Sequence, residues 1–172
     1  SNFSDCISTE SSGGAVYIIG NNTHVIDCGF DNCRVDVKGD HRGGAIYVDN
    51  SVSNLTLRST FINNTAVGDG GAAYFSRITS FKNNTFINNT ISSQEKSGGA
   101  IYVPAGTLIN NSTFIHNGGE KNGGAIYAHK NITCNNVVFE NNHAAKNGGA
   151  IYVETGLNVD NCIFDGNFAP EG

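Results

Sequence analysis

The 172-residue sequence predicts a single all-β domain over residues 1–172, built as a parallel β-solenoid of about six coils. Two motifs alternate along the whole chain at a period of 25 to 30 residues, which is the signature of a repeat architecture. The repeats are rich in Val, Ile, Tyr, Thr and Phe, with Gly and Asn between them, and this composition favours strands over helices. Each repeat is therefore expected to form one coil of two or three short strands, and equivalent residues of neighbouring coils should form columns about 4.8 Å apart.

The first motif is a glycine pair followed by a small residue and a short apolar strand. Successive glycine pairs are 30, 27, 28, 25 and 25 residues apart. The glycines permit a bend or a positive φ where the coil turns into this strand. The motif reads GGAVYI at 13–18, GGAIYV at 43–48, GGAAYF at 70–75, GGAIYV at 98–103, GGAIYA at 123–128 and GGAIYV at 148–153.

Alternation along this strand separates its aliphatic residues from its tyrosines. We expect the aliphatic column in the core and the tyrosines in a stacked, partly exposed ladder, with the reverse parity as the alternative. Such a ladder is a candidate interaction surface, suited to stacking on sugars or packing against another chain. Its members are Tyr17, Tyr47, Tyr74, Tyr102, Tyr127 and Tyr152.

The second motif is a phenylalanine followed three residues later by asparagine. We expect the phenylalanines to form an inward aromatic stack and the asparagines to close the corner that follows. In-register asparagines can hydrogen-bond to the coils on either side, which is a structural role rather than a catalytic one. The predicted core stack is Phe3, Phe30, Phe61, Phe86, Phe114, Phe139 and Phe164. The predicted ladder is Asn64, Asn89, Asn117, Asn142 and Asn167.

The two halves of the repeat differ in how constant their lengths are. The distance from glycine pair to phenylalanine is 17, 18 and then four times 16 residues, whereas the distance from phenylalanine to the next glycine pair varies from 9 to 13. A stacked strand path must keep its length, while a surface loop tolerates insertion. The inserted segments 34–42 and 91–97 are therefore predicted to be loops.

Five cysteines are too few for a disulfide-dense scaffold, and none are arranged as CxxC pairs. Cys6 and Cys33 take the asparagine position in the first two coils, which places their Cα atoms about 5 Å apart, within disulfide range. We predict a disulfide between them in an oxidising compartment; the alternative is two buried free thiols. Cys28, Cys134 and Cys162 share no matching column, and their pairing stays open.

Nine Asn-x-Ser/Thr sequons are candidate N-glycosylation sites, provided that the protein is exported and the sequons are exposed. The alternative is that an Asn- and Thr-rich repeat generates sequons by chance. The sequons begin at Asn2, Asn21, Asn54, Asn63, Asn83, Asn88, Asn110, Asn111 and Asn131.

The alternation of GGA(I/V) with FxxN resembles the passenger repeats of the chlamydial polymorphic membrane proteins. The combination of FINNTA, at 61–66, with GGAIY, which occurs at 43–47, 98–102, 123–127 and 148–152, also resembles the adhesin-like surface proteins of methanogenic archaea. The resemblance covers essentially the whole chain and implies a right-handed β-helix displayed at a cell surface, with roles in adhesion. The chain departs from the pattern by carrying FxxC at its first two phenylalanine motifs.

Polysaccharide lyases and hydrolases also use parallel β-helices, so an enzyme is an alternative function. Such a site needs carboxylates or a base converging on a groove, whereas the acidic residues here are scattered along the sequence. The five histidines show no metal-ligand spacing, and neither a metal nor a cofactor is expected. The densest polar cluster is Asp36, Asp40, His41 and Arg42, which falls in a variable loop and is expected to be solvated.

We expect a non-enzymatic, extracellular structural or adhesive protein. A net charge of −5 argues against nucleic acid as a partner, and no apolar run is long enough to span a membrane. The expected partners are host-cell proteins or glycans, together with other copies that contact the solenoid ends or outer face. The chain is expected to be either a segment of a longer array or a filament subunit. Ice binding is the alternative, since Thr60, Thr85 and Thr113 form one column, although Gly29, Val138 and Ile163 interrupt it.

Overall fold

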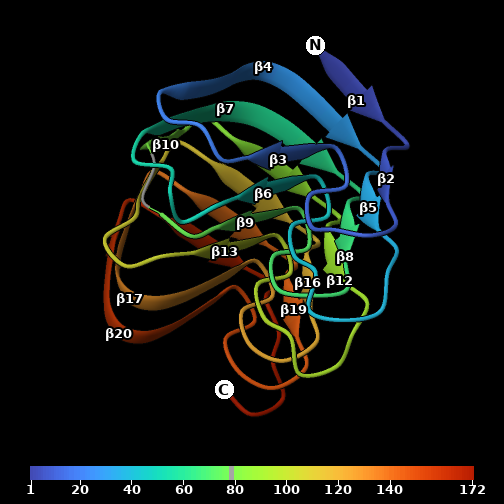
Figure 1. The fold of residues 1–172 in the computed structure, drawn as a ribbon. Coiled ribbons are helices and arrows are strands. Elements are labelled where there is room, and N and C mark those ends of the chain that lie inside the picture. The colour runs from blue at the N-terminus through green and yellow to red at the C-terminus, as the bar shows by residue number, and fades with distance from the viewer. Residues whose placement is uncertain (78–79) are drawn as a thin grey trace.

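The computed structural model describes residues 1–77 and 80–172 and confirms the predicted all-β parallel solenoid of about six coils. Figure 1 shows the coils stacked one on another from the N-terminal strands to the C-terminal ones. Every regular element in the described ranges is a strand, and every strand pair is parallel. The period of the sequence motifs is thus the length of one coil.

Each coil contributes strands to a tyrosine face, a connecting face and a phenylalanine face, and to a row of two-residue strands. The tyrosine face consists of β3 (Val16–Ile18), β6 (Ile46–Val48), β9 (Ala73–Phe75), β13 (Ile101–Val103) and the first parts of β17 (Ile126–Asn135) and β20 (Ile151–Asp160). The connecting face consists of the first parts of β4 (Thr23–Asp31) and β7 (Leu55–Ile62), then β10 (Ser80–Lys82), β14 (Leu108–Asn110) and the last parts of β17 and β20.

The phenylalanine face and a row of two-residue strands complete the coil. The phenylalanine face consists of β1 (Asn2–Ser4), the last parts of β4 and β7, β11 (Thr85–Ile87), β15 (Thr113–Ile115), β18 (Val138–Glu140) and β21 (Ile163–Asp165). The short row consists of β2 (Ile7–Ser8), β5 (Arg34–Val35), β8 (Thr65–Ala66), β12 (Thr90–Ile91), β16 (Gly118–Gly119) and β19 (His143–Ala144).

The register places identical motif positions on top of one another. Tyr102 pairs with Tyr127, and Phe86 pairs with Phe114. On the tyrosine face, Ile46 and Val48 are fully buried while Tyr47 between them is half-buried. The aliphatic residues therefore face the core and the tyrosines face outward.

The phenylalanines form a continuous stack inside the solenoid. Neighbouring rings from Phe3 to Phe164 are nearly parallel, with centroids 4.7 to 5.2 Å apart. The five central rings are almost completely buried, whereas Phe164 in the last described coil is 47% exposed. Each of these five rings is thus covered by the coils on both sides, whereas Phe3 and Phe164 at the two ends of the stack are more open.

The two glycines of each pair have different tasks. The first, for example Gly70, has a φ of 72°, which is a left-handed conformation that favours glycine. The second, for example Gly71, lies so close to the next coil that a Cβ would overlap the carbonyl oxygen of Gly99. The pair therefore both turns the chain and lets neighbouring coils approach at strand spacing.

The inserted loops are shorter than the sequence suggested. Arg34 and Val35 form β5, and Ile91 ends β12, so both predicted loops begin inside the short row of strands. These residues pair with the neighbouring coils: Arg34 lies opposite Ile7, and Ile91 opposite Ala66. The inserted residues proper are 36–42 and 92–97, and they leave the solenoid beside the tyrosine face.

Candidate binding groove

The six tyrosines form one ladder that runs along the solenoid axis. Centroids of successive rings are 4.6 to 5.5 Å apart from Tyr17 to Tyr152. Tyr17 at one end is 48% exposed, whereas Tyr74 near the middle is only 8% exposed. Burial is also the main reason why the pKa of Tyr74 and that of Tyr102 lie above the ordinary tyrosine value.

Within the ladder, the tyrosines cover one another's ring faces. Tyr47, Tyr74, Tyr102 and Tyr127 each contact a ring on both sides, at interplanar angles of 6° to 36°. A sugar cannot stack on a face that is already covered. What the middle of the ladder offers is ring edges and a row of hydroxyl groups, not the stacking surface expected from the sequence.

Arg42 reaches the ladder from the end of the first inserted loop. Its Nη1 donates to the Tyr74 hydroxyl at 3.0 Å, its Nη2 donates to Asp40 at 2.6 Å, and its guanidinium carbon lies 4.7 Å from the Tyr74 ring centroid. The sequence-based expectation that this polar cluster is merely solvated is wrong for Arg42. Its side chain forms one wall of a groove over the tyrosines.

Asp69 lies on the same side of the ladder, where it is partly enclosed. Its carboxylate accepts the backbone N–H of Ser97 at 2.9 Å, and its second oxygen is 3.9 Å from Arg42 Nε. Burial raises the pKa of Asp69 above the ordinary value for an aspartate, despite the positive charges of Lys96 and Arg42. The carboxylate is thus a fixed acceptor rather than a mobile surface charge.

One carboxylate oxygen of Glu154, on β20, contacts two side chains of the neighbouring strand β17. Tyr127 donates its hydroxyl to this oxygen at 2.6 Å, and His129 Nδ1 lies 3.1 Å from the same oxygen. Burial first and then the bond to Glu154 raise the pKa of Tyr127 above its ordinary value, while the two partners lower the pKa of Glu154. Sequence reasoning did not find this cluster, because the three residues are up to 27 positions apart.

Two hollows follow the ladder and meet at Tyr102 and His129, which line both. The larger, of about 530 Å³, lies over Tyr47, Tyr74 and Tyr102 beside Arg42. The smaller, of about 230 Å³, lies over Tyr102 and Tyr127 beside Asp69 and Lys121. We call the two hollows together the tyrosine groove. It is long, shallow and lined by hydroxyl and charged groups, as a site for an extended polar polymer would be.

The charged residues of the groove wall are paired across coils. Glu95 accepts Lys121 at 2.8 Å and Lys146 at 2.7 Å, and Asp40 accepts Lys96 at 2.7 Å in addition to Arg42. The two lysines hold the pKa of Glu95 down at about 2. These ion pairs tie together loops of different coils and engage the cationic side chains Arg42 and Lys121 of the wall. Asp49, which lines the larger hollow, forms no ion pair within the described residues.

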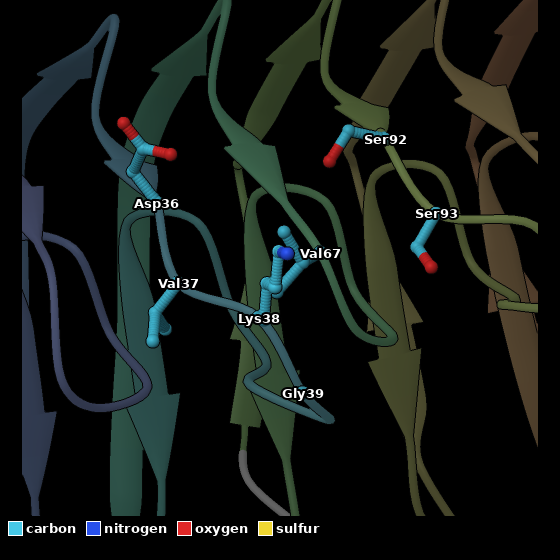
Figure 2. A pocket seen from close by; sticks show the side chains of 7 residues that line it. All are labelled: Asp36, Val37, Lys38, Gly39, Val67, Ser92 and Ser93. Atoms are coloured by element: carbon cyan, nitrogen blue, oxygen red, sulfur yellow. The ribbon is translucent and has the colours of Figure 1, made fainter.

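A separate hollow of about 410 Å³ lies beside the inserted loop 36–39 (Figure 2) and shares no lining residue with the tyrosine groove. It is lined by Asp36, Val37, Lys38, Gly39, Val67, Ser92 and Ser93. Its polar side chains come from separate loops and do not point at a common spot. We therefore regard the tyrosine groove as the better candidate site.

The asparagines of the second motif form a buried hydrogen-bonded ladder. Each from Asn64 to Asn142 donates its backbone N–H and an amide N–H to the side-chain oxygen of the next asparagine, at 2.8 to 3.0 Å. The amide also donates to a phenylalanine carbonyl of the preceding coil, for example from Asn89 to Phe61 at 3.1 Å. All of these bonds stay within the solenoid, so the ladder belongs to the fold and not to a site.

Two cysteines continue the asparagine column at its N-terminal end. Cys6 and Cys33 lie in adjacent coils, with Arg34 donating to the Cys6 carbonyl at 2.8 Å; both are free thiols, and the disulfide between them stays a prediction. Burial raises the pKa of Cys33 to about 11. Cys162 lies 3.2 Å from the carbonyl oxygen of Cys134.

A second polar column, two residues before each phenylalanine, was missed in the sequence. Asn84 accepts the backbone N–H of Ser59 at 2.8 Å, and Ser112 accepts that of Asn84 at 3.2 Å. Cys28 donates its N–H to Ser59 at 3.3 Å, and Cys162 stands at the same repeat position. The expectation that Cys28 and Cys162 share no column is therefore wrong, although four coils separate the two.

Threonines and sequons lie outside the tyrosine groove. Thr60, Thr85 and Thr113 are in register on the phenylalanine face, flanked by Gly29 and Val138 in the next coils. Of the nine sequon asparagines, Asn110 is half-buried and the other eight are exposed. The backbone φ of Asn63, Asn83, Asn88, Asn111 and Asn131 is positive, which marks corner positions.

Two further classes of site have no candidate in residues 1–77 and 80–172. No group of three or more His, Cys, Asp or Glu side chains is placed to hold a metal ion there. Nor does that part of the chain contain a helix long and apolar enough to cross a bilayer.

Comparison with known proteins gives one match. A family model described as a right-handed β-helix region matches residues 14–170. No curated protein and no solved structure matches the chain. The match covers nearly the whole solenoid and adds the right-handed sense to the coil seen in Figure 1.

Proposed function

The chain belongs to the right-handed β-helix family, and from that premise we propose that it is a non-enzymatic extracellular rod that binds surface glycans in its tyrosine groove. The observation that carries this proposal is the row of tyrosine hydroxyls along two connected hollows. The tyrosines repeat once per coil, with ring centroids 4.6 to 5.4 Å apart in the groove, which is close to the length of one sugar unit in a linear polysaccharide. Hydroxyl and carboxylate groups at such intervals are suitable partners for the hydroxyls of a glycan.

The state of the groove carboxylates supports binding rather than hydrolysis. Glycoside hydrolysis needs one carboxyl group that carries a proton and another that attacks or activates water. Glu95 and Asp40 are each held by two cationic side chains, and Glu154 by Tyr127 and His129. The pKa values of these three carboxyl groups lie below the ordinary range, which is unsuitable for a general acid at neutral pH. Burial raises the pKa of Asp69, but its carboxylate already accepts the Ser97 backbone N–H and lies 3.9 Å from Arg42.

The motif resemblance and the exposed sequons support an extracellular location. The alternating GGA(I/V) and FxxN motifs resemble those of surface-displayed adhesin-like repeats, and eight of the nine sequon asparagines are accessible to modification. In this proposal the partner is a glycan of a cell surface, and a cell-surface protein is the alternative partner for the same groove.

Self-association through the solenoid ends is part of the same proposal. In the last described coil, Ile163, Phe164 and Phe168 are 47% to 59% exposed. A further coil, of this chain or of a second copy, would cover this surface; if a second copy supplies it, the rod extends into a filament. Electron microscopy of the native material distinguishes filaments from single rods.

Ice binding is the second candidate, favoured by the in-register Thr60, Thr85 and Thr113 with Ile62, Ile87 and Ile115 beside them. The regular part covers only three coils, since Gly29 and Val138 replace threonine on either side. An ice-recrystallisation assay with Thr85→Asn tests it, with inhibition by the parent protein and loss in the variant as the positive result.

A glycan array tests the main proposal. Tyr102→Phe removes one hydroxyl from the floor of both hollows without changing the ring, so we expect binding to a retained glycan to weaken by roughly tenfold. Tyr17→Phe is the matched control, because Tyr17 is in the same ladder but lines neither hollow. Absence of any glycan signal, or equal binding by the two variants, would count against the proposal.

A further inference from the structure

His129 stands where the two hollows of the tyrosine groove meet. It lines the larger hollow together with Tyr74 and Tyr102, and the smaller one together with Tyr102 and Tyr127. Its side chain is 53% exposed, so a ligand that passes from one hollow to the other must pass this imidazole. The side chain thus occupies the middle of the groove, not its edge.

The imidazole ring is oriented differently from every tyrosine that it touches. Its plane makes an angle of 82° with the Tyr102 ring and 80° with the Tyr127 ring, at centroid distances of 5.6 and 5.4 Å. The tyrosine planes lie across the solenoid axis because they stack along it, so the imidazole plane runs along the axis. The imidazole faces are therefore outside the stack that covers the tyrosine faces.

Glu154 fixes this orientation. Its oxygen lies 3.1 Å from His129 Nδ1 and also accepts the Tyr127 hydroxyl, so the imidazole is held on one side by its Nδ1. A ring held in this way loses less conformational freedom on binding than a free surface histidine would.

The paired charges of the groove indicate the class of ligand. Arg42 is neutralised by Asp40 and lies 3.9 Å from Asp69, and Glu95 is neutralised by two lysines. An acidic polysaccharide would need an unpaired cation to compensate for the desolvation of its carboxylates. A neutral chain needs only hydroxyl and carboxylate partners together with a ring face for its apolar carbon–hydrogen surface.

We propose that His129 is the stacking platform of the glycan site: one pyranose ring of a neutral, linear oligosaccharide lies against the imidazole face, and the neighbouring sugar units enter the two hollows. This inference rests on the proposed glycan-binding function and names the residue that selects the ligand. The tyrosines contribute hydrogen bonds from their hydroxyls, and His129 contributes the aromatic face that the ladder itself lacks.

Calorimetric titration with β-1,4-linked glucose oligomers of increasing length tests the proposal. For the parent protein we expect affinity to rise once the oligomer is long enough to enter both hollows. His129→Ala should weaken binding of the long oligomers by about tenfold, whereas His129→Phe should retain most of it, because a flat ring remains. His24→Ala is the matched control, since His24 is an exposed histidine that lines neither hollow.

The outcomes separate the two proposals. If the parent protein binds no oligosaccharide on the array or in solution, the proposed function fails. If it binds, but His129→Ala binds as well as His24→Ala, the groove is a glycan site without this platform and the inference is wrong. If oligogalacturonate binds more tightly than the neutral oligomers, the assignment to a neutral ligand is overturned. Circular dichroism of each variant shows whether the fold is retained.

Discussion

The side-chain oxygen of Asn89 accepts two hydrogen bonds from Asn64, one from the backbone N–H at 3.0 Å and one from the amide Nδ2 at 2.9 Å. Asn89 in turn makes the same two bonds to Asn117. Because both residues are fully buried, no water can replace a bond that is lost. The asparagine column is therefore a chain of dependent hydrogen bonds that passes through the corners of successive coils.

Replacing Asn89 with Ala should lower the free energy of unfolding by roughly 3 kcal/mol. The substitution leaves the Asn64 N–H without an acceptor and the Phe61 carbonyl without its donor, both in the interior. Urea unfolding followed by circular dichroism measures the change. The matched control is Asn88→Gly, which alters an exposed corner residue and tolerates its φ of 53°; an equal loss in both variants would contradict the role given to the ladder.

Gly71→Ala should be among the most damaging single-methyl changes in the chain. The new Cβ would overlap the Gly99 carbonyl oxygen of the next coil, and backbone on both sides prevents either atom from moving away. We expect a loss of about 3 kcal/mol or failure to fold. Gly20→Ala is the control, since a Cβ there meets nothing within 4 Å. Similar melting temperatures for the two variants would refute the close-approach explanation.

Oxidised glutathione should join Cys6 to Cys33. Thiol–disulfide exchange transfers two electrons from the pair to glutathione disulfide, releases reduced glutathione and closes a loop of one coil. The bond should raise the free energy of unfolding by about 3 kcal/mol. Peptide mapping by mass spectrometry identifies the linked cysteines, and reductant should reverse the gain.

A variant with asparagine at both positions separates covalent from hydrogen-bonded linkage. Cys6→Asn with Cys33→Asn extends the asparagine ladder by two coils, because Asn64 already accepts the backbone N–H of residue 33 at 3.0 Å. Its stability should not depend on reductant. A disulfide that joins other cysteines, or a reductant effect that persists in this variant, would show that the register argument is wrong.

The Glu95 ion pairs make part of the stability depend on pH. The pKa of Glu95 is lowered from 4.5 to about 2 by Lys121 and Lys146, so its contribution is complete above pH 4.5 and is lost as the pH falls toward 2. Glu95→Gln should therefore lower the urea midpoint at pH 7 and have no effect near pH 2. Because Glu95 is exposed, the difference will be small and should shrink in high salt. Glu10→Gln, at a residue with no ion pair in the described chain, is the control.

The repeating coil could be predicted from the sequence, whereas the tyrosine groove could not. Residues equivalent to Gly71 and Phe86 recur at a nearly regular period, because in-register stacking repeats the same packing environment in each coil. The columns of stacked residues can therefore be identified from the sequence. Arg42 and Glu154 do not recur. Their positions depend on how one inserted loop folds back and on which side chain the next coil happens to supply, and no periodic signal encodes either.

The second polar column illustrates an intermediate case. Ser59, Asn84 and Ser112 perform the same hydrogen-bonding task with different side chains, so a search for identical letters passes over them. Alignment on the neighbouring phenylalanine would have revealed that this position is small and polar in most coils. The orientation of the tyrosine rings, in contrast, follows from packing between coils and could not be read from the positions of the tyrosines.

Hydrogen bonds that run from coil to coil, as in the pairing of Tyr102 with Tyr127, also determine how the molecule responds to force. Tension between the two ends of the chain loads the coil junctions in series, so the outermost coil should peel away first while the others keep their shape. Each 25-residue coil that opens releases roughly 80 Å of extended chain. A rod built in this way lengthens in discrete steps and dissipates energy at each one, a property that would suit the surface role proposed above.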